Sequence, residues 1–497
     1  MSSVSSPNPD AAEPAHADAP APRPALRAAP AAAVVRTHKF GGTSVADAAR
    51  ILALRPLVDD GADTRVVVVS AMSGTTNALI AMAELALAGQ GWQADWDALR
   101  ERHLQTADAI DPERRRGLRE AVAADFDDLR RDLDALALGA GDAAPLLAQV
   151  HGLGEIVSSR LVQSALGDGW ARLDARDVLV VHPGEMGVGV DWAASRERAD
   201  AWRARSAASR VVVTGFVARD RDGRSTTLGR NGSDYSAAIF ANLFDADELT
   251  IWTDVDGVLS ADPRLVPDAM VLPTMSYAEA CELAYFGAKV LHPQTMAPVQ
   301  SRGIPLCIRN TLRPSAPGTW ILAENPAGDA ELSPVKGLTI VRDMAVLELA
   351  GNGMVGVPGT AEKLFAALHG AGVSVVMISQ GSSEHSICCV VRAGQVEAAR
   401  AAVEDAFADA MADTQTQAVD VTHGIAILAA VGDGMVGIPG VAARLFAALA
   451  QARVNIRAIA QGASERNISV AIADADATRA LRAAHSAFWL SPQTVSV

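Results

Sequence analysis

The sequence predicts an α/β protein with two regions: a mainly parallel sheet between helices, followed by a pair of smaller modules. In the first 330 residues, short β-branched runs alternate with helical stretches, a pattern typical of a parallel sheet covered on both faces. The later region contains an internal repeat with a spacing of 81 residues. Hydrophobic residues make up 49% of the 497 positions, enough to bury the cores of about three domains.

The larger region is expected to contain strands at 34–35, 66–69, 211–213 and 249–252. Helices are expected at about 77–88, within 92–138 and at 233–243. Parallel sheets of this kind bind ligands at the carboxyl ends of their strands. Chemically distinctive motifs should therefore follow the strands, and the motifs described below do.

Two copies of one pattern fill the chain after about residue 334. Each copy predicts a strand, a glycine-rich loop (351–359 or 432–440), a helix, a strand, a turn and another strand. Two copies are too few for a solenoid, so we interpret them as paired small α/β modules. The loops match a dinucleotide-binding fingerprint, but Gln380 and Gln461 stand where an acidic residue would bind the ribose. The matched glutamines instead suggest small polar ligands at both loops.

Composition argues against several classes of function. A net charge of −15 disfavours nucleic acid or an anionic membrane as the main partner, and no apolar run approaches the roughly 20 residues of a membrane span. The sequence has four cysteines, Cys281, Cys307, Cys388 and Cys389. Their spacing is not that of metal ligands, and so few cysteines in a long chain fit a protein of the reducing cytosol. Residues 1–34, rich in Ala and Pro, are expected to form a disordered tail and not a signal or transit peptide.

A first glycine loop directly follows the opening strand. It is not a Walker A loop, because no Gly-Lys-Ser/Thr follows at the required spacing. Gly41 and Gly42 would let backbone N–H groups approach phosphate oxygens, and Lys39 would add a compact positive charge. The alternative is a plain turn with a solvated lysine.

A second glycine-rich turn, 229–234, precedes the predicted helix 233–243. Ser233 or Asp234 would make an ordinary N-terminal cap for this helix. Arg230 can instead offer its planar fork to a carboxylate. Both interpretations remain open from the residues alone.

Two further motifs, around Asp254 and around Lys289, also have simpler structural explanations. Asp254 and Asp256 follow a strand and are reminiscent of a calcium loop, but the remaining ligands are missing and we reject that interpretation. Lys289 is either a surface charge or a second phosphate clamp. His292, just before Pro293, is better explained as a structural residue at a helix start than as a base.

Together these strings resemble the aspartokinase family of amino-acid kinases, from about residue 35 to the end of the chain. The motifs that carry the resemblance occur in the family's order: 39–45, 70–77, 154–155, 229–234, 252–257 with 262–264, and 287–293. Asn231 replaces the middle glycine of one motif, and Leu259 stands where the family commonly has tyrosine. Several of these motifs differ from the family's common form, and the differences are similar to those in the kinase half of bifunctional aspartokinase–homoserine dehydrogenases. Because the chain stops about where the dehydrogenase half would start, we expect only the kinase activity.

The resemblance implies an amino-acid kinase fold over residues 35–325 and two tandem ACT-type α+β regulatory modules at 338–415 and 420–497. It implies an aspartate kinase, which transfers the ATP γ-phosphoryl group to the β-carboxylate of L-aspartate and gives 4-phospho-L-aspartate. This is the first step towards threonine, lysine, methionine and isoleucine. ATP with Mg²⁺, a cytoplasmic location and a homodimer or homotetramer joined through the ACT modules are also implied, while the magnesium ligands are not identified.

The resemblance also assigns roles to individual residues. Lys39 and Asp234 are implied to be catalytic. The implied substrate-binding residues are Thr76, Glu155, Arg230 and Ser233. The implied ATP-binding residues are Gly41, Gly42, Thr253, Asp254, Arg264 and Lys289. Gln380 and Gln461 are expected to bind the feedback amino acid, with threonine favoured over lysine.

The chemistry of this reaction agrees with the residues present. An aspartate side chain has a reference pKa of about 3.9, so the nucleophile is ionised without a base. The enzyme must bring two anions together and neutralise charge, which cations and glycine amides can do. Arg230 and Glu155 would suit any α-amino acid, so a kinase for another acid such as glutamate is one alternative. A silent amino-acid sensor is the other, disfavoured by the retained Lys39, Arg230 and Asp234.

Overall fold

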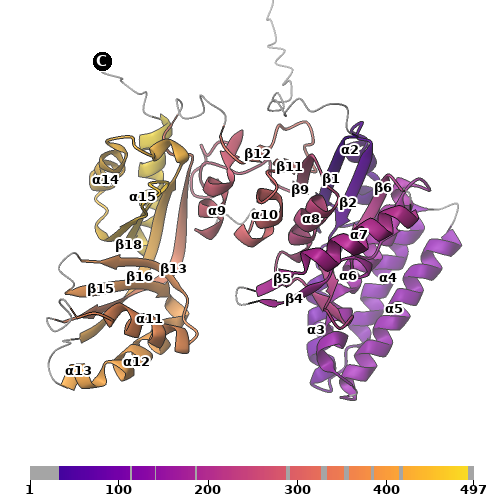
Figure 1. Ribbon diagram of the computed structural model, residues 1–497, viewed down its shortest axis with the longest axis horizontal. Helices are drawn as coiled ribbons and strands as arrows, with labels where there is room; N and C mark the ends of the chain where they lie inside the picture. The colour runs from indigo at the N-terminus through magenta and orange to yellow at the C-terminus, as the bar shows by residue number, and fades with distance from the viewer. Residues whose placement is uncertain are drawn as a thin grey trace, which may run out of the picture.

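The computed structural model describes residues 33–111, 115–139, 141–184, 187–206, 208–286, 291–325, 333–351, 357–381, 385–412 and 418–490. The predicted tail, 1–34, lies outside the described residues except for its last two positions. The described residues form two bodies, an N-terminal domain up to residue 325 and a C-terminal region from residue 333 (Figure 1).

An eight-stranded sheet with strand order β10-β12-β11-β9-β1-β2-β6-β3 forms the centre of the N-terminal domain. All neighbouring strands are parallel except β11 and β12. The predicted mainly parallel sheet is thus confirmed. The strands are β1 (Val35–Phe40), β2 (Thr64–Val69), β3 (Ala171–Leu173), β6 (Arg210–Thr214), β9 (Glu248–Thr253), β10 (Thr274–Ser276), β11 (Leu306–Asn310) and β12 (Thr319–Leu322).

Helices cover both faces of this sheet, as the strand pattern predicts (Figure 1). One layer contains α1 (Ala48–Leu52), α3 (Thr75–Leu87), α4 (Gln93–Ile110), α5 (Arg115–Ala137) and α6 (Ala143–Leu166). The other contains α7 (Trp192–Ser206), α8 (Gly232–Leu243) and α10 (Pro293–Gln300), while α9 (Tyr277–Tyr285) lies at the β10 end. Short elements complete the domain: α2 (Arg55–Val58) and the hairpins β4 (Val181–Gly184) with β5 (Gly187–Val190) and β7 (Val217–Arg219) with β8 (Ser225–Thr227).

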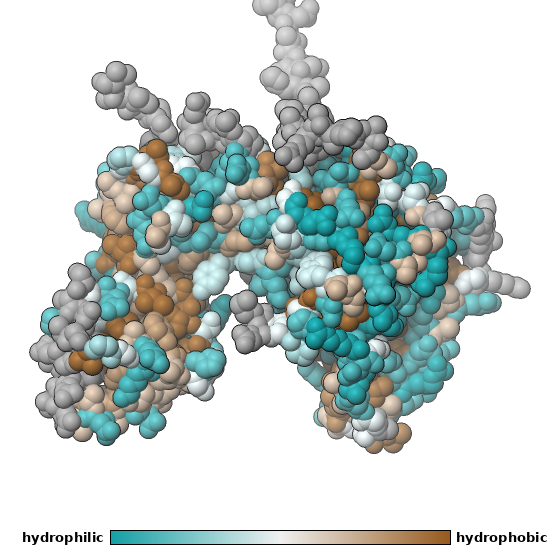
Figure 2. Space-filling model, viewed as in Figure 1, coloured by the Kyte–Doolittle hydropathy of each residue, from teal (hydrophilic) through white to brown (hydrophobic). Residues whose placement is uncertain are grey.

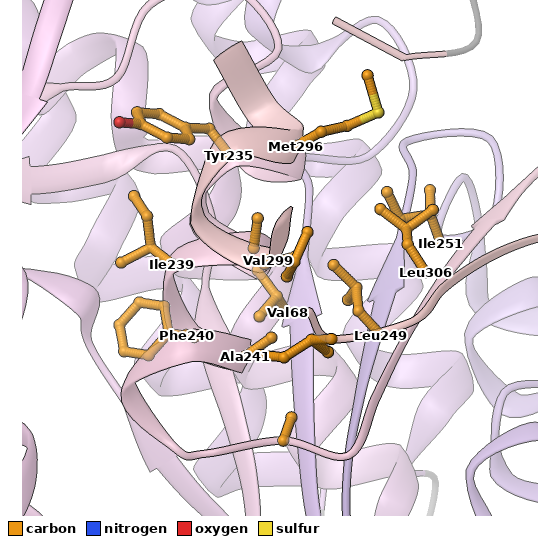
Figure 3. Close-up of a cluster of buried hydrophobic side chains, with 14 of the residues drawn as sticks. Val68, Tyr235, Ile239, Phe240, Ala241, Leu249, Ile251, Met296, Val299 and Leu306 are labelled. Atoms are coloured by element: carbon orange, nitrogen blue, oxygen red, sulfur yellow. The ribbon is translucent and has the colours of Figure 1, made fainter. Parts of the chain in front are cut away.

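The valines of β2 explain why two helical layers form. Side chains alternate across a strand, so Val67 and Val69 pack against the first layer while Val66 and Val68 pack against the second. Figure 3 shows the second of these cores, where Val68 meets side chains from α8, α10 and neighbouring strands. Burying both faces fixes the central strands and the loops that follow them.

A six-stranded antiparallel sheet with order β14-β15-β13-β16-β18-β17 forms the C-terminal region. Its strands are β13 (Gly337–Ala350), β14 (Val375–Gln380), β15 (Ser386–Arg392), β16 (Ala418–Val431), β17 (Ile456–Gln461) and β18 (Asn467–Ala473). Its helices are α11 (Thr360–Gly370), α12 (Val396–Ala406), α13 (Ala408–Ala412), α14 (Val441–Gln451) and α15 (Ala477–His485). The predicted repeat is confirmed: β13, α11, β14 and β15 correspond to β16, α14, β17 and β18.

Two long strands are shared between the modules. Residues 344–350 of β13 pair with β15, and 346–350 also pair with 418–422 of β16, whereas 337–341 pair with 427–431 of β16. We call the half-sheet under α11–α13 module 1 and the half-sheet under α14 and α15 module 2. The two halves have separate hydrophobic cores on their helical sides. Each module therefore completes its sheet with half a strand that runs on from the other module.

Among the described residues, no helix has the length and apolarity needed to cross a membrane. The four cysteines have free thiols.

Candidate functional site

Four loops lie side by side at the carboxyl ends of β1, β2, β6 and β9. Backbone hydrogen bonds join them in sequence: Gly41 N to Trp252 O (3.2 Å), Ser70 N to Phe40 O (3.1 Å) and Gly215 N to Val69 O (3.0 Å). This is the edge at which the sequence places its motifs. We call it the strand-end site.

The first glycine loop is packed tightly against its neighbour. A Cβ atom on Gly42 would lie 3.0 Å from the Ala71 carbonyl oxygen, and Ser73 N donates to the Gly42 carbonyl at 3.1 Å. A Cβ atom on Gly41 would lie 3.5 Å from Lys39 Nζ. Glycine at both positions keeps the backbone beside the lysine uncovered by side chains.

The fold brings the two predicted catalytic residues together, although they are far apart in sequence. Lys39, near the end of β1, is buried with its side chain only 9% exposed, and its Nζ lies 2.6 Å from Asp234 Oδ1. Asp234 occupies the first turn of α8, where the helix dipole stabilises a carboxylate. The result is a cation held in place at the end of the central strand.

The start of α8 differs from the predicted cap. The N-cap residue is Asn231, whose φ of 56° is left-handed, and its side chain makes no capping hydrogen bond. The helix begins at Gly232, where a Cβ atom would lie 2.6 Å from the Phe216 ring. The interpretation of Ser233 or Asp234 as the cap is therefore wrong, because the helix already begins at Gly232, after the left-handed Asn231.

As a consequence, the first turn of α8 faces the strand-end site. Ser233 Oγ lies 2.7 Å from Ser70 Oγ, at the end of β2. Ser70 is a site residue that the sequence analysis did not select, although it begins one of the family motifs. Thr76 lies partly buried in the first turn of α3, and Arg230 is exposed on the turn before α8.

Glu155 is a buried carboxylate in α6, behind the same loops. It is 4% exposed, and its Oε2 has no hydrogen-bond partner among the described residues. Burial raises the pKa of Glu155 to about 8, opposed by a hydrogen bond from the Ala71 backbone and by the charge of Lys39. Buried polar atoms are nearly always paired, so an unpaired oxygen here indicates a site for a donor carried by a ligand.

The nucleotide residues suggested by sequence are less closely grouped. Thr253 ends β9, and its hydroxyl lies 3.3 Å from the carboxylate of the exposed Asp254. Arg264 is exposed and paired with Asp262 at 2.7 Å, on a segment that continues into contacts with α15. Lys289 lies outside the described residues. The ATP-binding role of these residues remains a prediction.

His292 has the structural role expected from its place before Pro293. It is the N-cap of α10, and its Nδ1 accepts a hydrogen bond from Gln294 N at 3.3 Å. The interpretation of this histidine as a helix-start residue is confirmed.

Gln461 lines a cavity of about 330 Å³ in module 2, beside the start of α14. The cavity is also lined by Gly437 and Glu465, whose carboxylate accepts a hydrogen bond from Gly437 N at 2.7 Å. Glu465 is not among the residues expected from the sequence, although it lies in the matched string that follows Gln461. Gln380 is exposed at the corresponding end of β14, and the loop segments 352–356 and 382–384 of module 1 lie outside the described residues.

Known proteins similar to this chain cover both of its regions. A model of the amino acid kinase family matches residues 36–310, and an ACT domain model matches 347–407 and 428–488. The chloroplastic bifunctional aspartokinase/homoserine dehydrogenase 1 of Zea mays is 42% identical over 470 residues, which cover 93% of this chain and 51% of that protein. Chloroplastic aspartokinase 3 of Arabidopsis thaliana is 30% identical over 468 residues, covering 91% and 81%.

Solved structures show the same arrangement. Escherichia coli aspartokinase III in complex with aspartate and ADP gives a TM-score of 0.74 at 28% identity, covering 91% of this chain and 99% of that chain. The Clostridium acetobutylicum aspartate kinase gives 0.77 at 25% identity, covering 91% and 100%. The chain spans about half the length of the bifunctional relatives that it matches. By these matches, the chain belongs to the amino acid kinase family and, within it, to the aspartokinases with paired ACT domains.

Proposed function

We propose that the chain is an aspartate kinase, which transfers the γ-phosphoryl group of ATP to the β-carboxylate of L-aspartate and gives 4-phospho-L-aspartate. The observation that carries the proposal is the ion pair of the buried Lys39 with the partly buried Asp234, near the unpaired oxygen of Glu155. The similarity to E. coli aspartokinase III, solved with aspartate and ADP, supports it.

In this reaction Lys39 and the backbone amides of Gly41 and Gly42 hold the transferring phosphoryl group. The β-carboxylate is ionised at neutral pH, so the protein needs no base and has to neutralise charge as it develops. Asp234 holds the Lys39 side chain in place through their ion pair. Preorganised donors of this kind stabilise the transition state without rearranging during the reaction.

Substrate recognition follows from complementary charges. Glu155 takes the α-ammonium group of aspartate, which supplies the donor that its Oε2 lacks. Arg230 binds the α-carboxylate through its planar fork. Thr76 and Ser233, the latter with Ser70, complete the pocket around the substrate.

The nucleotide binds next to the phosphoryl cradle, with Thr253, Asp254, Arg264 and Lys289 as its proposed contacts. Among the described residues, no group of three or more His, Cys, Asp or Glu side chains is arranged to hold a metal ion. That fits magnesium, which is usually bound by one or two carboxylates together with substrate phosphates. Bound in this way, Mg²⁺ would neutralise phosphate charge.

Regulation by a pathway product is the second part of the proposal. Gln461, in the module 2 cavity, and Gln380, at the matching position of module 1, bind the feedback amino acid, with threonine favoured and lysine second. The enzyme acts in the cytoplasm as a homodimer or homotetramer through its ACT modules, in the biosynthesis of threonine, lysine, methionine and isoleucine.

Trapping the acyl phosphate with hydroxylamine tests this function. ATP with aspartate should give the hydroxamate, and glutamate should give far less. Equal rates with glutamate would favour the broader amino-acid kinase, and no turnover with any acidic amino acid would favour a sensor. Adding threonine, lysine or methionine in turn identifies the effector.

A further inference from the structure

Helix α9 lies between the catalytic sheet and the C-terminal region (Figure 1). It follows β10, an edge strand of the catalytic sheet, and ends just before segment 287–290, which carries Lys289. One side of α9 meets module 2 along its whole length. Residues at positions 279, 282–283 and 286, spaced three to four apart, make these contacts.

Glu279 makes the contact at the start of the helix, and it is completely buried. Its Oε1 accepts a hydrogen bond from Asp433 N at 2.7 Å. Its Oε2 accepts from Ser276 N at 2.9 Å, which closes the capping box of α9, and from Asn325 Nδ2 at 2.8 Å. One carboxylate thus joins the N-terminus of a catalytic-domain helix to the backbone of a regulatory loop.

Asp433 belongs to the loop that lines the module 2 cavity. It is held on its other side by Arg466 at 2.6 Å, and Arg466 directly follows Glu465, which lines the same cavity. Asn325 also reaches Asp433, at 3.2 Å. A change in the cavity that moves this loop therefore moves a hydrogen-bond donor of a buried carboxylate.

Three more contacts extend the connection to the end of α9. Asn467 Nδ2 donates to Glu282 Oε2 at 2.8 Å, and Leu283 packs against Gly337, where a Cβ atom would lie 2.9 Å from its methyl groups. Thr339 Oγ1 donates to the Phe286 carbonyl at 2.6 Å. With both ends fastened, α9 and module 2 have to move together.

We propose that Glu279 is a positioning residue, which couples the state of the 432–440 loop to α9 and, through the capping box at Ser276, to β10 of the catalytic sheet. The inference rests on the proposed function for its effect on catalysis, but the mechanical connection itself does not. The position of Glu279 should respond strongly to its three N–H donors, because losing one of them leaves a charged carboxylate oxygen unpaired in the protein interior.

A matched pair of variants isolates the hydrogen bond between Asp433 N and Glu279. Asp433→Pro removes the backbone donor to Glu279, and proline is well tolerated at a first helical position such as this one. Asp433→Ala loses the same carboxylate but keeps the N–H group. Any difference between the two variants reports on the hydrogen bond to Glu279 and not on the contacts of the Asp433 side chain.

Amide hydrogen exchange of the full chain is the first measurement. In Asp433→Pro the amides of α9 should exchange about ten-fold faster than in Asp433→Ala, because a local opening loses one buried hydrogen bond. Equal protection of α9 in the two variants would overturn the proposal. The comparison does not require enzyme activity, so its result tests the contact between α9 and module 2 whether or not the proposed function is correct.

Inhibition is the second measurement, made with the amino acid that inhibits the wild type. Glu279→Gln should need about five-fold more effector for half-inhibition, with turnover in its absence within about two-fold, because the amide cannot accept all three donors. The thermal shift on effector binding should persist. Ser276→Ala is the control: it removes the other half of the capping box and leaves the Asp433 bond in place. Wild-type inhibition in Glu279→Gln, or equal loss in Ser276→Ala, would contradict the coupling role.

Discussion

The two ACT modules share one sequence pattern but differ in how they meet the catalytic domain. Module 2 contacts it at several points, including His485 Nε2 to Ser260 Oγ at 3.0 Å and Arg482 Nε to the Leu265 carbonyl at 2.7 Å. Ala261 and Val266 of the catalytic domain are part of the hydrophobic core of module 2. The module is thus built into the catalytic domain as well as placed beside it.

Module 1 touches the catalytic domain much less. Within the described part of the chain, its contacts include the Tyr285 hydroxyl, 3.4 Å from the Val376 carbonyl, and Phe286, which packs in a cluster with Met377. Figure 2 shows the surfaces of the two bodies joining near α9 and separating towards module 1. On the face shown, apolar residues gather over β16 and β18. A repeat in sequence therefore need not mean equal roles: among the described residues, module 2 has the more extensive contacts with the catalytic domain.

The largest expected effect separates the catalytic site from both modules. Lys39→Met should lower turnover by about 10³-fold, because the cation at the strand ends is lost. Lys363→Met removes an exposed lysine of module 1 and should leave turnover unchanged. Steady-state kinetics with ATP and aspartate make the comparison. Wild-type turnover in Lys39→Met would refute the phosphate cradle, and a defect in Lys363→Met would break the contrast between site and module 1.

A pair of core truncations compares the modules directly. Leu481→Ala in α15 and Leu364→Ala in α11 each remove a fully buried leucine, so each should cost about 2–5 kcal/mol of unfolding free energy. Only Leu481 shares its core with the catalytic segment 261–266. The KM for ATP should therefore rise in Leu481→Ala and stay near the wild-type value in Leu364→Ala, as measured by denaturant titration and kinetics. A similar rise in both would show that docking does not distinguish the modules.

The effector sites provide a third comparison. Gln461→Ala should raise the effector concentration for half-inhibition by about ten-fold and Gln380→Ala by less, with uninhibited turnover largely intact in both, since module 2 has the direct contacts. Dose–response curves of turnover against effector concentration, measured for both variants and the wild type, test this prediction. If neither variant loses sensitivity, the glutamines do not bind the effector.

The smallest effect concerns a group remote from both modules. Because the pKa of Glu155 is raised to about 8, its carboxyl is mostly neutral at pH 7 and becomes ionised as the pH rises. The substrate ammonium needs the ionised form, so KM for aspartate should fall by up to about eight-fold between pH 7 and 8.5. Glu155→Gln should bind aspartate weakly without this pH dependence, whereas Gln461→Ala should retain it. A flat wild-type profile would argue against this role of Glu155.

Much of the fold follows from local pattern. The valine runs 66–69 and 211–213 are central strands, the repeat is present, and Lys39, near the end of β1, meets Asp234 in the first turn of α8. These features depend on periodicity and on the general geometry of parallel sheets, which a sequence records directly.

Other features depend on long-range packing that the sequence does not record locally. The predicted cap of α8 is wrong, because the helix begins earlier, at Gly232, where the Phe216 ring across a loop leaves no room for a Cβ atom. Glu279 looks like an ordinary capping-box residue until Asp433, 154 positions later, is seen to bond to it. The sharing of β13 and β16 was also not evident, since a repeat locates strands without saying which ones pair.

The shared strands constrain how this regulatory region can be taken apart or inherited. Half of β13 belongs to the sheet of module 2 and half of β16 to that of module 1, so a cut between the repeats would strip an edge from both sheets. Neither repeat contains all the strands of one complete module. We expect the pair to unfold as one cooperative unit and to be gained, lost or recombined in evolution only together.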